Sequence, residues 1–225
     1  VTNTGTGTIT NKAGELNIGG SFTNTGNATV LNDGTKLAIS GNVTGKNGTM
    51  DITNNGAEGL IVEDSGRVDT QGLNMTNTGE GGLNIDGAVT NTGNSAVTNK
   101  AGELNIGGSF TNSNGTANLT NDGNVFNVTG DITGSNGVIN MTNNGAGGLN
   151  IASSGEINTQ GLNITNNGTG GLNIDGTVTN AGDGNYKNYE GSFNINENAK
   201  MNNTSGTANY YNEGNGLNIK GTINN

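Results

Sequence analysis

The chain has 225 residues, a formal net charge of −10 and only 28% hydrophobic residues, and it contains no His, Cys, Pro or Trp. These absences exclude disulfides, thiolate or imidazole metal sites, and Ser-His or Cys-His nucleophile pairs. With only eight Lys and Arg residues, the chain would be repelled by nucleic acid and by anionic lipid surfaces. No apolar run is long enough to insert into a membrane.

A large repeat organises the chain. The segment NKAGELNIGGSFTN occurs at residues 11–24 and again at 99–112, and residues 51–93 match residues 140–182. The offsets of 88 and 89 residues define large repeats at about 1–92 and 93–180, followed by a partial, divergent copy at 181–225. Asn, Thr and Gly, with 47, 32 and 43 residues, make up more than half of this repetitive sequence.

A shorter unit recurs inside the large repeat. It is an apolar-x-apolar triplet, which begins at Leu16, Leu37, Leu60, Leu83, Leu104, Phe126, Leu149, Leu172, Phe193 and Leu217. Successive triplets are 21 to 24 residues apart, so that four steps make one large repeat. This length is typical of one coil of a solenoid.

Each coil alternates apolar and polar residues with a period of two, which predicts β-strands. Gly, Asn and β-branched residues disfavour helix, and pairs such as Asp33-Gly34 supply turns. We therefore predict an all-β fold, a right-handed parallel β-helix of about ten coils of about 22 residues, with three short strands per coil. Disorder is the alternative that the mean hydropathy of −0.51 favours, but only 12% of the residues are charged.

Three inward rows are predicted, one for each strand of the coil. The first row contains the triplets. The second is Val1, Phe22, Val43, Val68, Val89, Phe110, Ile132, Ile157, Val178, Met201 and Ile223. The third is Val30, Ile52, Met75, Val97, Leu119, Met141, Ile164 and Tyr210. Because both ends fall within a coil, we expect residues 1–225 to be one β-helix segment of a longer array.

The repeated xLNIxGxxTNxG coils, from Val1 to about Gly182, resemble the exoproteins of bacterial two-partner secretion, namely the high-molecular-weight adhesins and filamentous haemagglutinin. Some autotransporter adhesins share this repeat style. The resemblance implies a secreted or surface-displayed fibre, exported by an outer-membrane transporter partner. Such a fibre attaches bacteria to host cells, through surface glycans or proteins, or to one another.

All four tyrosines fall in the divergent last copy. Aromatic rings stack on the C–H faces of sugars while amides bond sugar hydroxyls, so Tyr186, Tyr189 and Tyr211 form a candidate glycan site. The alternative is that Tyr210 fills the core and the other three pack beside it.

Many asparagines lie in N-x-S/T sequons, the acceptor sequence for N-glycosylation. They include Asn27, Asn42, Asn47, Asn74, Asn114, Asn118, Asn127, Asn140, Asn163, Asn167 and Asn202. Composition alone predicts about nine sequons, so these positions are possible glycosylation sites without being an enrichment.

Two outward rows are predicted to be structural. One contains Asn17, Asn84, Asn105, Asn127, Asn150, Asn173, Asn194 and Asn218, and the other contains Thr23, Thr44, Thr90, Thr111, Thr133 and Thr179. Stacked amides bond along the axis and Thr suits an exposed strand. A flat Thr array could instead bind ice, although Asp69 and Asn158 interrupt it.

The one compact charged cluster contains Glu63, Asp64, Arg67 and Asp69. Neighbouring carboxylates on a β-helix could cleave a polysaccharide, but the next large repeat carries Ala152, Ser153, Glu156 and Asn158 there. We therefore predict no enzyme, no metal and no cofactor. The leading hypothesis is a structural and adhesive segment of a surface fibre. A pure spacer is the alternative, and a polysaccharide-degrading enzyme is the third.

Overall fold

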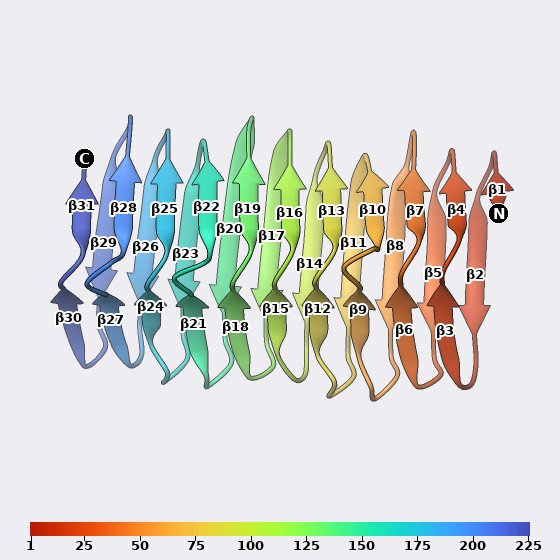
Figure 1. The fold of residues 1–225 in the computed structure, drawn as a ribbon, viewed down its shortest axis with the longest axis horizontal. Coiled ribbons are helices and arrows are strands. Elements are labelled where there is room, and N and C mark those ends of the chain that lie inside the picture. Colours follow the sequence, from red (N-terminus) through yellow and green to blue (C-terminus); the bar gives the residue numbers. More distant parts are fainter.

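The structure, a computed structural model, describes residues 1–225 and consists of 31 β-strands without a helix. Every third strand belongs to the same parallel sheet, so three strands make one coil and the coils stack into a rod (Figure 1). The N-terminus and the C-terminus lie at opposite ends of the rod. No helix is present that could cross a membrane.

The three sheets are named A, B and C in the order in which the chain enters them. Sheet A contains β1 (Thr2–Asn3), β4 (Ser21–Asn24), β7 (Asn42–Gly45), β10 (Arg67–Thr70), β13 (Ala88–Asn91), β16 (Ser109–Asn112), β19 (Asp131–Gly134), β22 (Glu156–Thr159), β25 (Thr177–Asn180), β28 (Lys200–Asn203) and β31 (Thr222–Asn224). Sheet B contains β2 (Gly7–Asn11), β5 (Ala28–Asn32), β8 (Thr49–Asn54), β11 (Gly72–Asn77), β14 (Ser95–Asn99), β17 (Gly115–Asn121), β20 (Gly137–Asn143), β23 (Leu162–Asn166), β26 (Gly184–Asn188) and β29 (Ala208–Asn212). Sheet C contains β3 (Glu15–Ile18), β6 (Lys36–Ile39), β9 (Leu60–Val62), β12 (Leu83–Ile85), β15 (Leu104–Ile106), β18 (Val125–Val128), β21 (Gly148–Ile151), β24 (Leu172–Ile174), β27 (Ser192–Ile195) and β30 (Gly216–Ile219).

The register places like residues above one another. Leu83 pairs with Leu104 in sheet C, and Thr76 pairs with Thr98 in sheet B. In-register stacking of this kind lets identical side chains bond along the axis of the rod. The predicted fold class, an all-β parallel solenoid with three strands per coil of about 22 residues, is confirmed.

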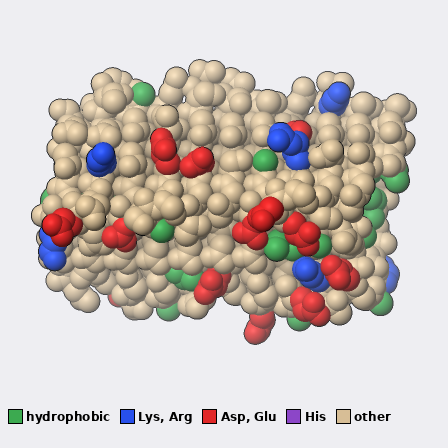
Figure 2. Space-filling view, in the orientation of Figure 1, with side chains coloured by type: hydrophobic (Ala, Val, Ile, Leu, Met, Phe, Trp, Pro, Cys, Tyr) green, Lys and Arg blue, Asp and Glu red, His purple; other side chains and the backbone are tan.

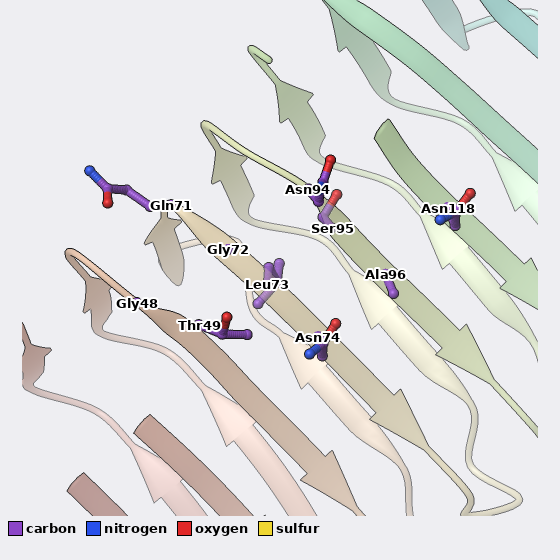
Figure 3. Close-up of a pocket in the computed structure, with 10 residues that line it drawn as sticks. All are labelled: Gly48, Thr49, Gln71, Gly72, Leu73, Asn74, Asn94, Ser95, Ala96 and Asn118. Atoms are coloured by element: carbon purple, nitrogen blue, oxygen red, sulfur yellow. The ribbon is translucent and has the colours of Figure 1, made fainter. Parts of the chain in front are cut away.

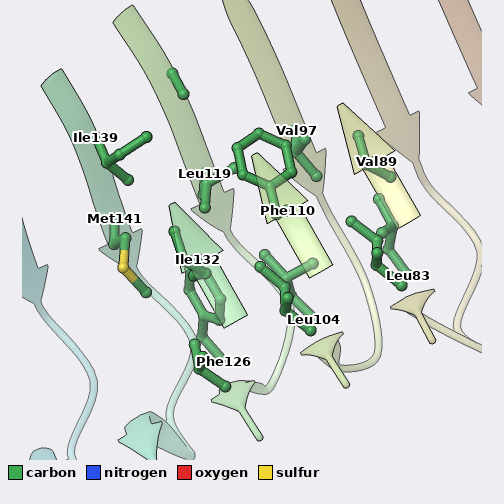
Figure 4. Close-up of a cluster of buried hydrophobic side chains, with 14 of the residues drawn as sticks. Leu83, Val89, Val97, Leu104, Phe110, Leu119, Phe126, Ile132, Ile139 and Met141 are labelled. Atoms are coloured by element: carbon green, nitrogen blue, oxygen red, sulfur yellow. The ribbon is translucent and has the colours of Figure 1, made fainter. Parts of the chain in front are cut away.

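A single hydrophobic core of 41 buried residues runs through the rod. The three predicted inward rows form most of it, and Figure 4 shows side chains of the core meeting between the sheets. The sequence analysis missed a further inward row at the start of the sheet B strands, which contains Ala28, Met50, Leu73, Ala117, Ile139 and Leu162. Only members at the two ends are exposed, with Val1, Leu217 and Ile219 at 82%, 45% and 51%. The low hydrophobic content is thus sufficient because each coil encloses a narrow interior.

The third row has two more members than predicted, Ile9 and Tyr186. Ile9 lies in register with Val30 and is partly buried against the core. Tyr186 stands in register between Ile164 and Tyr210 and is only 2% exposed, so it belongs to the core. A Cβ at Gly184 would lie 3.0 Å from the Tyr186 hydroxyl, so this glycine leaves room for the phenol.

Asparagines that end the strands of sheet B form a buried ladder. Nine consecutive side-chain hydrogen bonds of 2.7–3.0 Å join ten residues: Asn11, Asn32, Asn54, Asn77, Asn99, Asn121, Asn143, Asn166, Asn188 and Asn212. In each bond the Nδ2 of one coil donates to the Oδ1 of the next. The sequence analysis did not predict this ladder.

Most ladder amides also close the turn between sheets B and C. In eight of the ten residues the second Nδ2 proton donates to a backbone carbonyl two or three residues later, as from Asn99 to Gly102. Gly102 has a φ of 67°, a conformation that favours glycine. No buried side-chain nitrogen or oxygen lacks a partner, so the polar interior does not carry an uncompensated desolvation cost.

The corner between sheets A and B is packed by size complementarity. The residue that ends each sheet A strand from β1 to β28 precedes the first inward residue of the next sheet B strand, and the sizes of the two vary inversely. Where the first is Gly45 or Gly134, an added Cβ would lie 3.3 Å from Met50 or 2.8 Å from Ile139. The pairs are Asn3 with Gly7, Asn24 with Ala28, Gly45 with Met50, Thr70 with Leu73, Asn91 with Ser95, Asn112 with Ala117, Gly134 with Ile139, Thr159 with Leu162, Asn180 with Gly184 and Asn203 with Ala208. Asn pairs with a small residue, whereas Gly or Thr pairs with a large apolar one.

The buried ladder makes a prediction about stability. Asn99→Ala orphans one buried proton of Asn77 and the Oδ1 of Asn121, so it should destabilise the protein by about 2–4 kcal/mol. Asn105→Ala removes two bonds of similar length at a half-exposed position and should cost less than about 1 kcal/mol. Urea unfolding followed by far-UV circular dichroism compares the two variants, and equal shifts of the midpoint would contradict the ladder's role.

The corner packing predicts a compensating pair. A Cβ at Gly45 would lie 3.3 Å from Met50 Cε, so Gly45→Asn should destabilise the protein by about 1–3 kcal/mol through overpacking. Met50→Ala alone should cost about 2–5 kcal/mol through the cavity it leaves. The double variant recreates the Asn24 and Ala28 pair, so it should be more stable than the sum of the single changes predicts. Additive changes in a denaturation cycle would refute the coupling.

Candidate functional site

The four tyrosines form two pairs on opposite sides of sheet B. Tyr186 and Tyr210 point inward and stack, with ring centroids 5.0 Å apart and an interplanar angle of 15°. Tyr189 and Tyr211 lie outside, edge to face, with centroids 5.8 Å apart and an angle of 61°. Tyr210 also lies 6.4 Å from Phe193, which ties the inner pair to sheet C.

We call Tyr189 and Tyr211, with Lys187 and Glu213 beside them, the tyrosine patch. Tyr211 takes the outward position that Lys187 holds in β26, and Tyr189 directly follows that strand. As whole residues, Tyr189 is 37% exposed and Tyr211 is 44% exposed. The Tyr211 hydroxyl donates a hydrogen bond to the Glu213 carboxylate. This bond raises the pKa of Tyr211, because the phenol proton is the donor.

Of the three tyrosines predicted to form a glycan site, the structure brings Tyr189 and Tyr211 together at the surface. It does not bring Tyr186 to them, because Tyr186 lies in the core. Tyr186 occupies the same position in its coil as Ile164 and Tyr210 do in theirs, and the sequence analysis assigns both of those residues to the core. Aligning the three coils would therefore have placed Tyr186 inward. Burial raises the pKa values of both Tyr186 and Tyr210.

None of the predicted sequon asparagines is buried. They differ in whether the side-chain amide already donates a hydrogen bond. Five donate to a side chain of the preceding coil: Asn74 to Asp51, Asn127 to Asn105, Asn140 to Asn118, Asn163 to Asn140 and Asn167 to Asn144. The side chains of Asn27, Asn42, Asn47, Asn114, Asn118 and Asn202 donate no hydrogen bond within the chain. Since a glycan attaches at Nδ2, these six are the sequons where attachment breaks no such bond.

The outward rows face solvent as predicted. In sheet C, six hydrogen bonds of 2.7–3.0 Å join Asn84, Asn105, Asn127, Asn150, Asn173, Asn194 and Asn218. Sheet B carries a further outward row that the sequence analysis missed, an unbroken run of Thr53, Thr76, Thr98, Thr120, Thr142 and Thr165. The rod therefore presents neutral amides and hydroxyls on several faces.

No ion pair joins Arg67 to Glu63, Asp64 or Asp69 in the predicted charged cluster. The two ion pairs of the protein lie elsewhere, between Lys12 and Asp33 and between Lys36 and Glu15. Asp86 has a raised pKa, mainly because of burial and also because Asp64 is near. No group of three or more acidic side chains is placed to hold a metal ion. Figure 2 shows the charges scattered over a mostly neutral surface.

Comparisons with protein families, with curated proteins and with solved structures found no match to this chain. The functional interpretation therefore rests on the repeat pattern of the sequence and on the geometry of the structure.

The buried phenol of Tyr186 predicts a pH dependence. Unfolding exposes a phenol that ionises near pH ~10, whereas in the folded protein burial keeps it neutral to higher pH. The stabilisation is complete below pH ~10 and is lost as pH rises from there towards the raised folded pKa. In Tyr186→Phe this loss should be smaller. Urea midpoints of both proteins at neutral and strongly alkaline pH test this, and identical pH profiles would exclude the effect.

Proposed function

We propose that this chain is a structural and adhesive repeat segment of a large secreted bacterial surface fibre that attaches to host-cell glycans. The resemblance to two-partner-secretion exoproteins supports the surface location and export through an outer-membrane transporter. The stacked coils support the role of a scaffold. No step of turnover is part of the proposal, because the fibre acts by presenting a surface.

The observation that carries the adhesive part is the tyrosine patch. Tyr189 and Tyr211 are the exposed aromatic rings of the rod, and their edge-to-face contact holds them at a fixed angle. An exposed ring face packs against the C–H face of a sugar, while nearby amides such as Asn209 and Asn185 bond hydroxyls. Lys187 places a positive charge and Glu213 a negative charge beside the rings, so the patch favours neither an anionic nor a cationic ligand.

Rigidity supports the same proposal. The inner tyrosine pair and the last members of the buried ladder, Asn188 and Asn212, hold β26 and β29 in place beneath the patch. A rigid patch loses little conformational entropy on binding. Weak contacts repeated along neighbouring fibres would then combine through avidity.

Binding should depend on the outer tyrosines. On a glycan array, the double variant Tyr189→Ala and Tyr211→Ala should lose at least tenfold of the signal of the parent protein. The matched control, Thr90→Ala and Thr111→Ala, changes two outward residues of sheet A and should bind as the parent does. Both variants keep the core residues Tyr186 and Tyr210, so their unfolding midpoints should stay close to that of the parent.

Other array results would decide against this proposal. Absence of binding by the parent protein would favour a pure spacer that holds other parts of the fibre away from the cell. Binding that survives in the tyrosine variant would place the glycan site elsewhere on the rod. Release of shorter products from the printed polysaccharides would favour the enzyme alternative.

A further inference from the structure

Sheet B carries a hollow of about 480 Å³ on its outer face, at the start of β8, β11, β14 and β17 (Figure 3). Two outward-facing positions with little or no side chain form the floor of the hollow. Gly72 has no side chain, and Ala96, on the neighbouring strand, has only a methyl group. We call this hollow the Ala96 groove.

Amide side chains form the walls of the Ala96 groove. Ala96 lies in register between Asn74 and Asn118, and the three cross neighbouring strands in one row (Figure 3). Gln71 and Asn94 lie at the rim, near the start of the strands. None of the ten lining residues is charged, and the inward-facing Leu73 is only 1% exposed.

The groove is the place where an outward asparagine ladder is interrupted. On this face the Nδ2 of each asparagine donates to the Oδ1 of the preceding coil, as from Asn140 to Asn118 and from Asn74 to Asp51. At Ala96 no amide is present, so Asn118 Nδ2 donates to no side chain and Asn74 Oδ1 accepts from none. A donor and an acceptor therefore face each other across the floor of the hollow.

The next large repeat closes the same position. Asn185 stands in the divergent third copy where the second large repeat has Ala96, and it donates to Asn163 and accepts from Asn209. The ladder is continuous there, and none of the three hollows of the protein lies at this place. The missing amide at Ala96 is the difference that interrupts the ladder, although the lining also differs at Thr49, Asn94 and Ser95, where the later coils have Val138, Asp183 and Gly184.

We propose that the Ala96 groove binds one unit of a neutral saccharide. The uncharged walls could not offset the cost of desolvating an ionic ligand. The floor of Gly72 and Ala96 offers too little apolar surface to favour a hydrophobic ligand. Amides that both donate and accept match hydroxyl groups, which do the same. The volume lies in the range of small-molecule sites. The inference rests on the proposed function for the class of ligand only, since the groove is separate from the tyrosine patch.

The test uses the whole chain, labelled with ¹⁵N on its side-chain amides, titrated with maltose, cellobiose, lactose and mannobiose at millimolar concentration. At least one disaccharide should shift the Asn74 and Asn118 amide signals. Ala96→Asn should abolish these shifts, because the new amide fills the hollow and completes the ladder as Asn185 does. Its unfolding midpoint should equal or exceed that of the parent.

Two controls separate the possible failures. Ala88→Asn adds the same amide to the outer face of sheet A and should leave the shifts unchanged. Asn118→Ala removes the free donor without filling the hollow and should weaken binding at least tenfold. No shift with any of the four sugars, or shifts that persist in Ala96→Asn, would overturn the proposal. The ring signals of Tyr189 and Tyr211 in the same titrations report separately on the tyrosine patch.

Discussion

The buried asparagine ladder is the interaction on which the rest of the structure depends. A coil of about 22 residues must turn between its sheets while enclosing only a few apolar side chains. One amide group of the ladder bonds both the asparagine of the next coil and a backbone carbonyl in the turn of its own coil. Asn99, for example, donates to Asn121 Oδ1 and to the Gly102 carbonyl. Because eight of the ten ladder residues also bond a turn carbonyl, a chain with little hydrophobic content can form a continuous core.

The regular interior leaves the exterior free to vary. At the corner between sheets A and B, either an amide with a small partner or a glycine with a large partner fills the same space, as Asn112 with Ala117 and Gly45 with Met50 show. On the outside, the change from a threonine row to Lys187 and Tyr211, or from Asn to Ala at residue 96, alters a surface without altering the register. The proposed binding surfaces are both local changes of this kind.

Much of the fold could be predicted because the 88- and 89-residue repeats and the period of two set strand positions directly. The three predicted apolar rows lie in the core, but the inward row at the start of the sheet B strands was missed. The ladder was missed because asparagine was assigned to the outside by its polarity. Counting two residues on from Val30 would have placed Asn32 inward. The tyrosine patch was predicted only in part, since Tyr186 was counted as a surface ring. The Ala96 groove could not be predicted, because it depends on which outward residues of four neighbouring strands lie in register around Gly72 and Ala96.

Hydrogen exchange of the asparagine side-chain amides, followed by NMR, tests the central role of the buried ladder most directly. The account predicts that Nδ2 protons from Asn54 to Asn166 in the buried ladder exchange as slowly as the backbone amides of the core strands. The half-exposed ladder of sheet C, from Asn105 to Asn173, makes bonds of the same length and should exchange much faster. Equal exchange rates in the two ladders would contradict the account, because the buried amides would then open to water without disturbing the coils.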